Sequence, residues 1–164
     1  MKERTLSALI VSCLAVVVGW QINALSATRD LTTPFIENRG QLPGDIRYYA
    51  TIRNGYCGIT NDGRLIYSLA DSENRYLLSE HFVSARDIHV NGESLAVTRV
   101  NYLKGSPARH STDIPTYNSV GFGEIYDGIE LRLGRSENNV EKVFVVKPFA
   151  DPGASWRNFK EFWL

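Results

Sequence analysis

The feature that most constrains this fold is a series of short β-prone segments separated by residues that favour tight turns. Residues 46–52 (IRYYATI) and 64–69 (RLIYSL) are rich in β-branched, aromatic and aliphatic side chains. Asn54-Gly55 follows the first segment, and residues 61–63 (NDG) precede the second. Asn, Asp and Gly tolerate the positive φ angles that tight hairpin turns require. The pattern therefore predicts antiparallel hairpins and an all-β fold.

A third hairpin turn is predicted at Asn91-Gly92, joining residues 87–90 to residues 94–100. Three hairpins of this kind, without any apolar stripe at helical spacing, favour an antiparallel sheet with one face in the core. The chain shows no repeat of fixed period. We therefore expect a single β-sandwich-like domain over residues 28–164.

Three further strands are predicted over residues 117–122, 128–133 and 140–147. In 128–133 (GIELRL) the apolar and charged side chains alternate, which is typical of a strand with one wet face. Residues 143–146 (VFVV) are continuously apolar. That run predicts a central strand covered on both faces.

The first 27 residues have the three-part layout of a secretory signal peptide. Lys2 and Arg4 precede an apolar run from Leu6 to Trp20, and small residues follow. Export requires a short hydrophobic helix behind a positive charge, and the signal peptidase requires small side chains near its cut. We expect cleavage after Ala27.

Two alternatives for the N-terminal segment stay open. Its uncharged span is long enough for an uncleaved membrane anchor. Cys13 ends a short motif with the shape of a lipoprotein cleavage site, although mostly apolar residues follow it. In each case the remainder is expected outside the cytoplasm, secreted or at the cell surface. Only the N-terminal segment, if uncleaved, would contact a membrane.

Charge and cysteine content exclude two classes of protein. The chain carries 18 basic and 18 acidic residues, so it lacks the basic surface of a nucleic-acid-binding protein. After signal removal Cys57 is the single cysteine, and no internal disulfide can form. The core must therefore supply the stability, and Cys57 is expected to be a small buried side chain within it.

The segment 34–50 (PFIENRGQLPGDIRYYA) contains a short polar segment, residues 38–41, between an apolar pair and an aromatic strand. Gly40 can adopt backbone angles closed to other residues, while Asn38 and Gln41 carry amides that can bond exposed backbone groups. This polar segment is therefore expected to form a structural corner of the chain. A loop that contacts a ligand is the alternative.

Six motifs follow one another along residues 34–153: NRGQ at 38–41, NYLKG at 101–105, IPTY at 114–117, IYDGIEL at 125–131, FVVKP at 144–148 and ADP at 150–152. In this order they resemble a β-rich domain of unknown function that precedes β-propeller-type (SBBP) repeats in large bacterial surface proteins. The resemblance implies a non-catalytic extracellular module, with downstream repeat domains or a surface glycan as partners. It also implies that this chain is a truncated member of the family.

This sequence departs from the family pattern at three positions in its second half, and at one of them Lys142-Val143 stands where the family often has Tyr-Asp. YDGIE stands where the family has Tyr-Pro-Gly-Ile-Asp, and PFADP stands where it has Pro-Gly-Ala-Asp-Pro. Phe149 enters positive φ less readily than the glycine it replaces. These departures concern the local turn geometry of the second half and leave the expected β fold unchanged.

No catalytic, cofactor-binding or metal-binding residue is predicted from a recognisable motif, and three weaker hypotheses were weighed. Paired carboxylates among Glu124, Asp127 and Glu130 would suit glycoside hydrolysis, which uses one acid and one base across a bond. Calcium would suit loop aspartates, and zinc would suit histidines, but neither set has ligand-like spacing. The aspartates are Asp113, Asp127 and Asp151, and the histidines are His81, His89 and His110.

Aromatic side chains offer a further hypothesis, because exposed rings can stack on sugars or on a neighbouring domain. The apolar C-terminal segment 156–164 (WRNFKEFWL) is expected to form a last strand or a short helix laid on the sheet. The sequence as a whole predicts a structural or adhesion module without catalysis. A carbohydrate-binding module and a glycan-acting hydrolase remain the alternatives. The candidate stacking residues are Tyr48, Tyr49, Tyr56, Tyr102, Tyr117, Tyr126 and Trp156.

Overall fold

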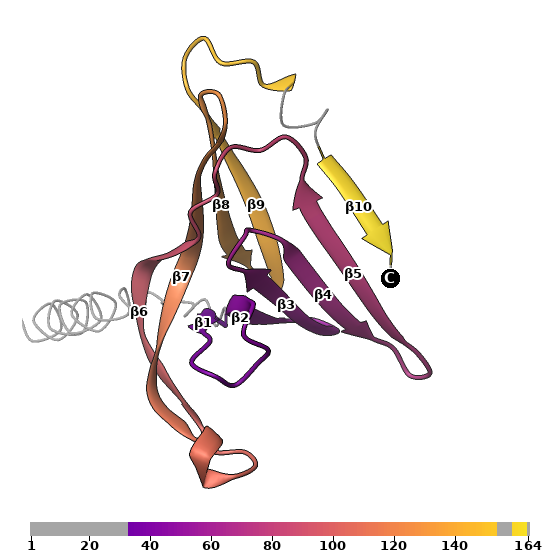
Figure 1. The fold of residues 1–164 in the computed structure, drawn as a ribbon, viewed down its shortest axis with the longest axis vertical. Coiled ribbons are helices and arrows are strands. Elements are labelled where there is room, and N and C mark those ends of the chain that lie inside the picture. Colours follow the sequence, from indigo (N-terminus) through magenta and orange to yellow (C-terminus); the bar gives the residue numbers. More distant parts are fainter. Residues whose placement is uncertain (1–32, 154–158, 164) are drawn as a thin grey trace, which may run out of the picture. The chain divides into compact units, whose positions relative to one another are not determined.

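The structure is a computed structural model that describes residues 33–153 and 159–163. This part of the chain forms ten strands and one 3-10 turn at Pro107–Arg109, and every strand pairing is antiparallel (Figure 1). The all-β prediction is confirmed. The predicted signal segment 1–27 and Trp156 lie outside the described residues. The strands are β1 (Phe35–Glu37), β2 (Ile46–Ile52), β3 (Gly55–Thr60), β4 (Leu65–Ala70), β5 (Arg75–Phe82), β6 (Asn91–Tyr102), β7 (Ser111–Tyr126), β8 (Ile129–Ser136), β9 (Asn139–Val146) and β10 (Phe159–Trp163).

The sheet forks at its longest strand, β7. Tyr117 pairs with Leu95 of β6 and with Phe35 of β1, whereas Val120 pairs with β6 and with β8. Because β6 occupies one side of β7 from Ser111 to Gly121, β1 and β8 must both lie on the other side. One branch then runs β1-β2-β3-β4-β5-β10, and the second is the hairpin β8-β9.

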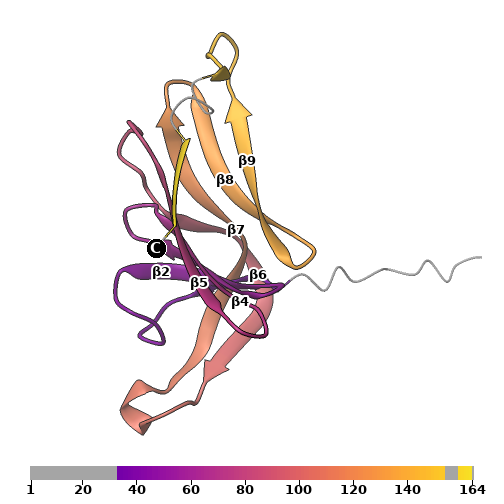
Figure 2. The same ribbon diagram turned by 90° about the vertical axis from the view of Figure 1, so that its right-hand side faces the viewer.

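The two branches curl until their inner faces pack together (Figures 1 and 2). Register shifts in β7 beside Gly121 and Gly123 accompany the divergence, since bulges bend and twist a strand. Backbone contact also joins the branches at their turns, where the Arg53 N–H donates to the Asn138 carbonyl at 2.8 Å. One folded-over sheet therefore produces the sandwich-like arrangement.

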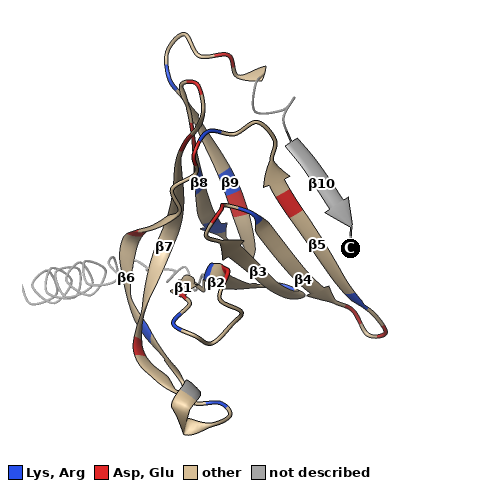
Figure 3. Ribbon diagram, in the orientation of Figure 1, with Lys and Arg blue, Asp and Glu red and all other residues tan. Residues whose placement is uncertain are grey.

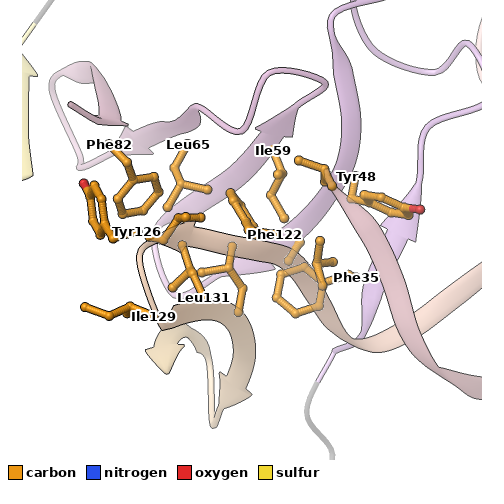
Figure 4. Close-up of a cluster of buried hydrophobic side chains, with 14 residues drawn as sticks. Phe35, Tyr48, Ile59, Leu65, Phe82, Phe122, Tyr126, Ile129 and Leu131 are labelled. Carbon is orange, nitrogen blue, oxygen red and sulfur yellow. The ribbon is translucent and has the colours of Figure 1, made fainter. Parts of the chain in front are cut away.

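The core lies between the branches (Figure 4). Phe35, Ile59 and Leu65 from the first branch are fully buried against Phe122 and Leu131 of β7 and β8. The alternation predicted for GIELRL is confirmed, since its three apolar side chains are all buried. A smaller cluster on the outer face of β1 and β2 packs beneath the far part of the β6-β7 hairpin. Its fully or mostly buried members are Ile36, Tyr49 and Ile114.

The polar segment 38–41 between β1 and β2 forms a structural corner, as predicted. The Asn38 side-chain nitrogen donates to the carbonyls of Leu42, Pro43 and Ile46, at 3.2, 3.2 and 2.7 Å. Its oxygen accepts from the Gly40 and Leu42 N–H groups at 3.1 Å each. Gly40 has φ +101°, a conformation that glycine adopts cheaply. The Asn38 side chain therefore takes the place of several backbone–backbone hydrogen bonds that the turn cannot make.

Gln41 completes this corner from a buried position. Its side-chain nitrogen donates to the Glu37 carbonyl at 3.2 Å, and its oxygen accepts from the Arg39 N–H. The side-chain amides of Asn38 and Gln41 thus both hydrogen-bond to the backbone of their own segment. The alternative of a ligand-contacting loop gains no support from this geometry.

The prediction that residues 143–146 form a central strand was wrong. In the described part of the chain β9 pairs only with β8, so it is an edge strand. Val143, Val145 and Val146 are 41%, 44% and 40% exposed. Only alternate residues of β9, such as Phe144, face the interior. A continuous apolar run therefore marks an exposed edge here rather than burial on both faces.

Two turn predictions also required correction. The β2-β3 hairpin exists, but its register places Arg53 and Asn54 in the turn and Gly55 at the start of β3. The hairpin predicted at Asn91-Gly92 is absent, because both residues open β6. A Cβ on Gly92 would lie 2.6 Å from the Tyr117 ring, and its N–H donates to the Tyr48 hydroxyl at 2.9 Å. This glycine permits close packing rather than a turn.

Two described strands complete the first branch. β5 was not predicted from sequence, because RYLLSEHF mixes polar and apolar residues without clean alternation. At the C-terminus, the strand alternative is confirmed over Phe159–Trp163, which pairs with β5. Within residues 33–153 and 159–163, no helix has the length and hydrophobicity that a membrane span requires.

Replacing Asn38 with alanine should lower the free energy of unfolding by about 1–3 kcal/mol, because partly buried backbone groups lose their partners. Urea denaturation measures this loss. The matched control is Arg39→Ala, which removes only an exposed ion pair with Glu37 and should cost less than about 1 kcal/mol. Equal effects of the two substitutions would contradict the structural role given to Asn38.

Candidate functional site

The densest group of ionisable side chains inside the fold lies between the two branches, and we call it the interior polar cluster (Cys57, Tyr67, Glu80 and Lys142). Glu80 on β5 has a side chain only 2% exposed. The Lys142 ammonium on β9 lies 2.6 and 2.7 Å from the two Glu80 oxygens. The Tyr67 hydroxyl on β4 hydrogen-bonds both Glu80 and Cys57. The cluster therefore connects three strands of one branch to the edge strand of the other.

Burial sets the protonation of this cluster. It raises the pKa of the Cys57 thiol to about 12, and the negative charge of Glu80 contributes. Burial also raises the pKa of the Tyr67 hydroxyl strongly, with further contributions from Cys57 and Glu80. Both groups are neutral at physiological pH. Since nucleophilic cysteines need a lowered pKa, the expected role of Cys57 as a buried, unreactive side chain agrees with the structure.

Arg135 on β8 makes a second polar contact between the branches. Its Nη2 donates to the Thr51 carbonyl of β2 at 2.8 Å, and its guanidinium carbon lies 5.7 Å from the centre of the Phe35 ring. Burial lowers the pKa of this guanidinium. The aromatic face offers a favourable surface for a weakly hydrated cation. Arg135 and the interior polar cluster therefore each link the two branches by polar contacts across the same core.

The carboxylates considered for glycoside hydrolysis form a surface ion-pair network. The Glu124 carboxylate contacts Arg86 Nη1 and Lys147 Nζ, each at 2.6 Å. Lys147 also contacts Glu130 at 3.0 Å, and Arg86 contacts Asp127 at 3.3 Å. The structure thus brings all three predicted carboxylates together, but each has a cation beside it.

The electrostatics of Glu124 do not suit a general acid. The hydrogen bond from Lys147 lowers the pKa of Glu124, and the Gly128 N–H and Arg86 act in the same direction. A catalytic acid for glycoside hydrolysis needs a raised pKa instead. The network stabilises the β7-β8 turn, because the Gly128 N–H donates to Glu124 at 3.2 Å.

The aspartates and histidines weighed as metal ligands do not gather in the described part of the chain. No group of three or more His, Cys, Asp or Glu side chains there has a metal-binding arrangement. Asp113 contacts Arg99 at 3.8 Å, and Asp151 accepts from the Gly153 N–H at 2.8 Å. The three candidate histidines lie in different segments: His81 on β5, His89 before β6, and His110 after the 3-10 turn.

The candidate tyrosines divide into two sets. Tyr48 packs edge-on against Tyr117 inside the fold, with ring centroids 5.6 Å apart, and Tyr126 is also buried. The outer tyrosine cluster consists of Tyr49, Tyr56 and Tyr102, which lie on the outer sheet face. Its three members differ in exposure: Tyr49 is buried, Tyr102 is half-buried and Tyr56 is 55% exposed.

Most of the interior polar cluster carries no signal in the sequence. The sequence singles out Cys57, but Tyr67, Glu80 and Lys142 show no local motif. Lys142 is 62 residues from Glu80, so only the fold brings them together. The one available signal was a single lysine facing inward among the apolar residues of VEKVFVV, since buried lysines require a partner.

A family model described as "Domain of unknown function (DUF7948)" matches residues 35–155. No curated protein matches the chain, and neither does any solved structure.

Removing one partner of the buried ion pair should destabilise the fold strongly. Lys142→Met should cost about 3–5 kcal/mol of unfolding free energy, because the Glu80 charge stays buried without its cation. Glu80→Gln combined with Lys142→Met should recover most of that loss. Lys147→Met, which removes exposed ion pairs, is the control and should cost less than about 1 kcal/mol. Purely additive losses in the double variant, measured by urea denaturation, would contradict this role.

The protein should lose stability in alkali through Cys57. Its folded pKa of about 12 exceeds the ordinary value of 9.0, so the unfolded chain releases the proton first. Stability is therefore complete below pH 9 and falls between pH 9 and 12 by about 1.4 kcal/mol per pH unit from this group. Thermal unfolding across this range measures the slope. Cys57→Ala should flatten it, leaving the contribution of Tyr67, and an unchanged slope would be inconsistent with the burial argument.

Proposed function

This chain belongs to the DUF7948 family of domains of unknown function, and from that premise we propose that it is a non-catalytic structural or adhesion module outside the cytoplasm. The observation that carries this proposal is the use made of its reactive groups. Glu80 and Lys142 neutralise each other inside the core, and Cys57 is held as a neutral thiol. The chemistry available in the described residues thus serves to hold two halves of a sheet together.

The surface supports the same proposal. Basic and acidic residues are interspersed along the described strands (Figure 3), whereas nucleic-acid binding favours clustered positive charge. The carboxylates at the β7-β8 turn are paired with Arg86 and Lys147. Charge of both signs, spread over a β-rich surface, suits a domain that is solvated on most sides and contacts its partners over limited areas.

The proposed location follows from the signal-like segment at residues 1–27. Outside the cytoplasm, a domain without an internal disulfide depends on its core and buried ties for stability. The resemblance of residues 34–153 to domains that precede SBBP repeats makes neighbouring repeat domains the proposed partners. Such a module would present or space those repeats at the cell surface.

Carbohydrate binding is the second candidate, favoured by the outer tyrosine cluster. Tyr56 is 55% exposed, and its row across the sheet continues through Ser68 to Leu77, which is 42% exposed. An exposed ring beside small and apolar neighbours offers a stacking surface for a sugar. The cluster is small, which suits a weak contact with a surface glycan.

One experiment separates the three functions. Protein recovered from the extracytoplasmic fraction, with Thr28 expected as its first residue, is assayed on a panel of polysaccharides for retention and for release of reducing ends. The structural function predicts neither. Retention weakened about tenfold by Tyr56→Ala, but not by Tyr76→Ala, would establish carbohydrate binding instead. Release of reducing ends that Glu124→Gln abolishes would overturn the non-catalytic proposal.

A further inference from the structure

The buried contact between Glu80 and Lys142 holds together the two groups that an amide bond would join. The Lys142 Nζ lies 2.6 Å from one Glu80 oxygen and 2.7 Å from the other. With both oxygens so close, Nζ also lies within about 3 Å of the carboxyl carbon, which is the separation of a near-attack conformer. Well-oriented groups of this kind reach effective concentrations of about 10⁵–10⁸ M. The nitrogen and the carbon are therefore already positioned for reaction.

Burial removes the solvent that would oppose such a bond. The Glu80 side chain is 2% exposed, and the Lys142 side chain is 24% exposed. Amide formation releases water, so a dry core favours the product and protects it from hydrolysis. A core of low dielectric also favours a neutral pair of groups over two separate charges. The surroundings thus favour the amide over the two ions.

Tyr67 supplies a hydrogen-bond donor at the carboxyl group. Its hydroxyl hydrogen-bonds Glu80 and Cys57, and burial raises its pKa, so it keeps its proton at physiological pH. Attack on the carboxyl carbon places negative charge on a carboxyl oxygen, and a fixed donor stabilises that charge. Tyr67 is therefore placed as the group that stabilises the transition state of an acyl transfer.

We propose that Glu80 and Lys142 become joined by an amide bond after the chain has folded. The proton in the hydrogen bond passes from Nζ to a Glu80 oxygen, which leaves an amine and a carboxylic acid. The Nζ lone pair then attacks the carboxyl carbon. The C–OH bond breaks, and the hydroxyl takes a proton from the nitrogen and leaves as water. The reaction is slow because Nζ must first give up its proton, so newly folded protein holds the ion pair and aged protein holds the amide.

The amide would link the two branches of the sheet covalently. Glu80 on β5 and Lys142 on β9 are 62 residues apart in the chain. A cross-link between distant residues stabilises a fold mainly by restricting the unfolded chain. The step needs no oxidant or other co-reactant, only the folded core. The inference therefore does not depend on the proposed location of the protein.

Lys147 provides a comparison within the same molecule. Its Nζ lies 2.6 Å from Glu124, the same separation as in the buried pair. The Lys147 and Glu124 side chains are 48% and 29% exposed, so solvent reaches both. This pair should therefore stay ionic. Burial and the hydroxyl of Tyr67, rather than distance alone, distinguish the reactive pair.

Intact-mass spectrometry of the purified protein, sampled over days from purification onward, tests the proposal. The expected result is the loss of one water, and a digest should contain a cross-linked peptide that joins Glu80 to Lys142. Lys142→Arg keeps a cation beside Glu80 but cannot form this amide, so it should retain its full mass. Tyr67→Phe removes the donor and should slow the loss of water at least about tenfold.

Three results would overturn the proposal. The first is a protein that keeps its full mass throughout. The second is a loss of water that persists in Lys142→Arg, since it would arise elsewhere in the chain. The third is a cross-linked peptide that contains Lys147 in place of Lys142. If Lys142→Arg does not fold, the double variant with Glu80→Gln and Lys142→Met replaces it, because that variant also lacks the amine.

Discussion

The whole structure depends on the fork at β7. Both branches of the sheet begin on the same side of this strand, and they curl from there until their inner faces pack together. The core forms only where the branches meet, with Phe35, Ile59 and Leu65 on one side and Phe122 and Leu131 on the other. Neither branch could bury its apolar face alone, since a single sheet needs a second layer. The bulge beside Gly123 therefore matters as much to the core as the apolar residues themselves.

The second constraint is the polar contact across that core. A buried ion pair rarely adds net stability compared with apolar packing, but it penalises every arrangement that separates the partners. Glu80 and Lys142 thereby specify how far β9 lies from β5, and Arg135 specifies the distance between β8 and β2. Because Glu80, Lys142 and Arg135 fix the distances between strands, these buried charged groups support a structural function.

Sequence alone predicted the features that depend on neighbours in the chain. The alternation in β8 and the side-chain amides of Asn38 and Gln41 could be interpreted correctly because their causes are local. Patterns with two possible causes could not be: a continuous apolar run fits a buried strand or an exposed edge, and Gly92 fits a turn or a close packing contact. The Glu80–Lys142 pair could not be predicted, because only the fork brings residues so distant in sequence together.

The central claim is that the two branches form one cooperative unit around one core. Native-state hydrogen exchange tests it most directly, because it measures the free energy of opening for each backbone amide. The structure predicts that the most protected amides of β3 and β4 and those of β8 open with the same free energy, equal to that of global unfolding. Exchange from the β8-β9 hairpin at a much lower free energy than from β3 and β4 would show that the branches fold separately, and would contradict the claim.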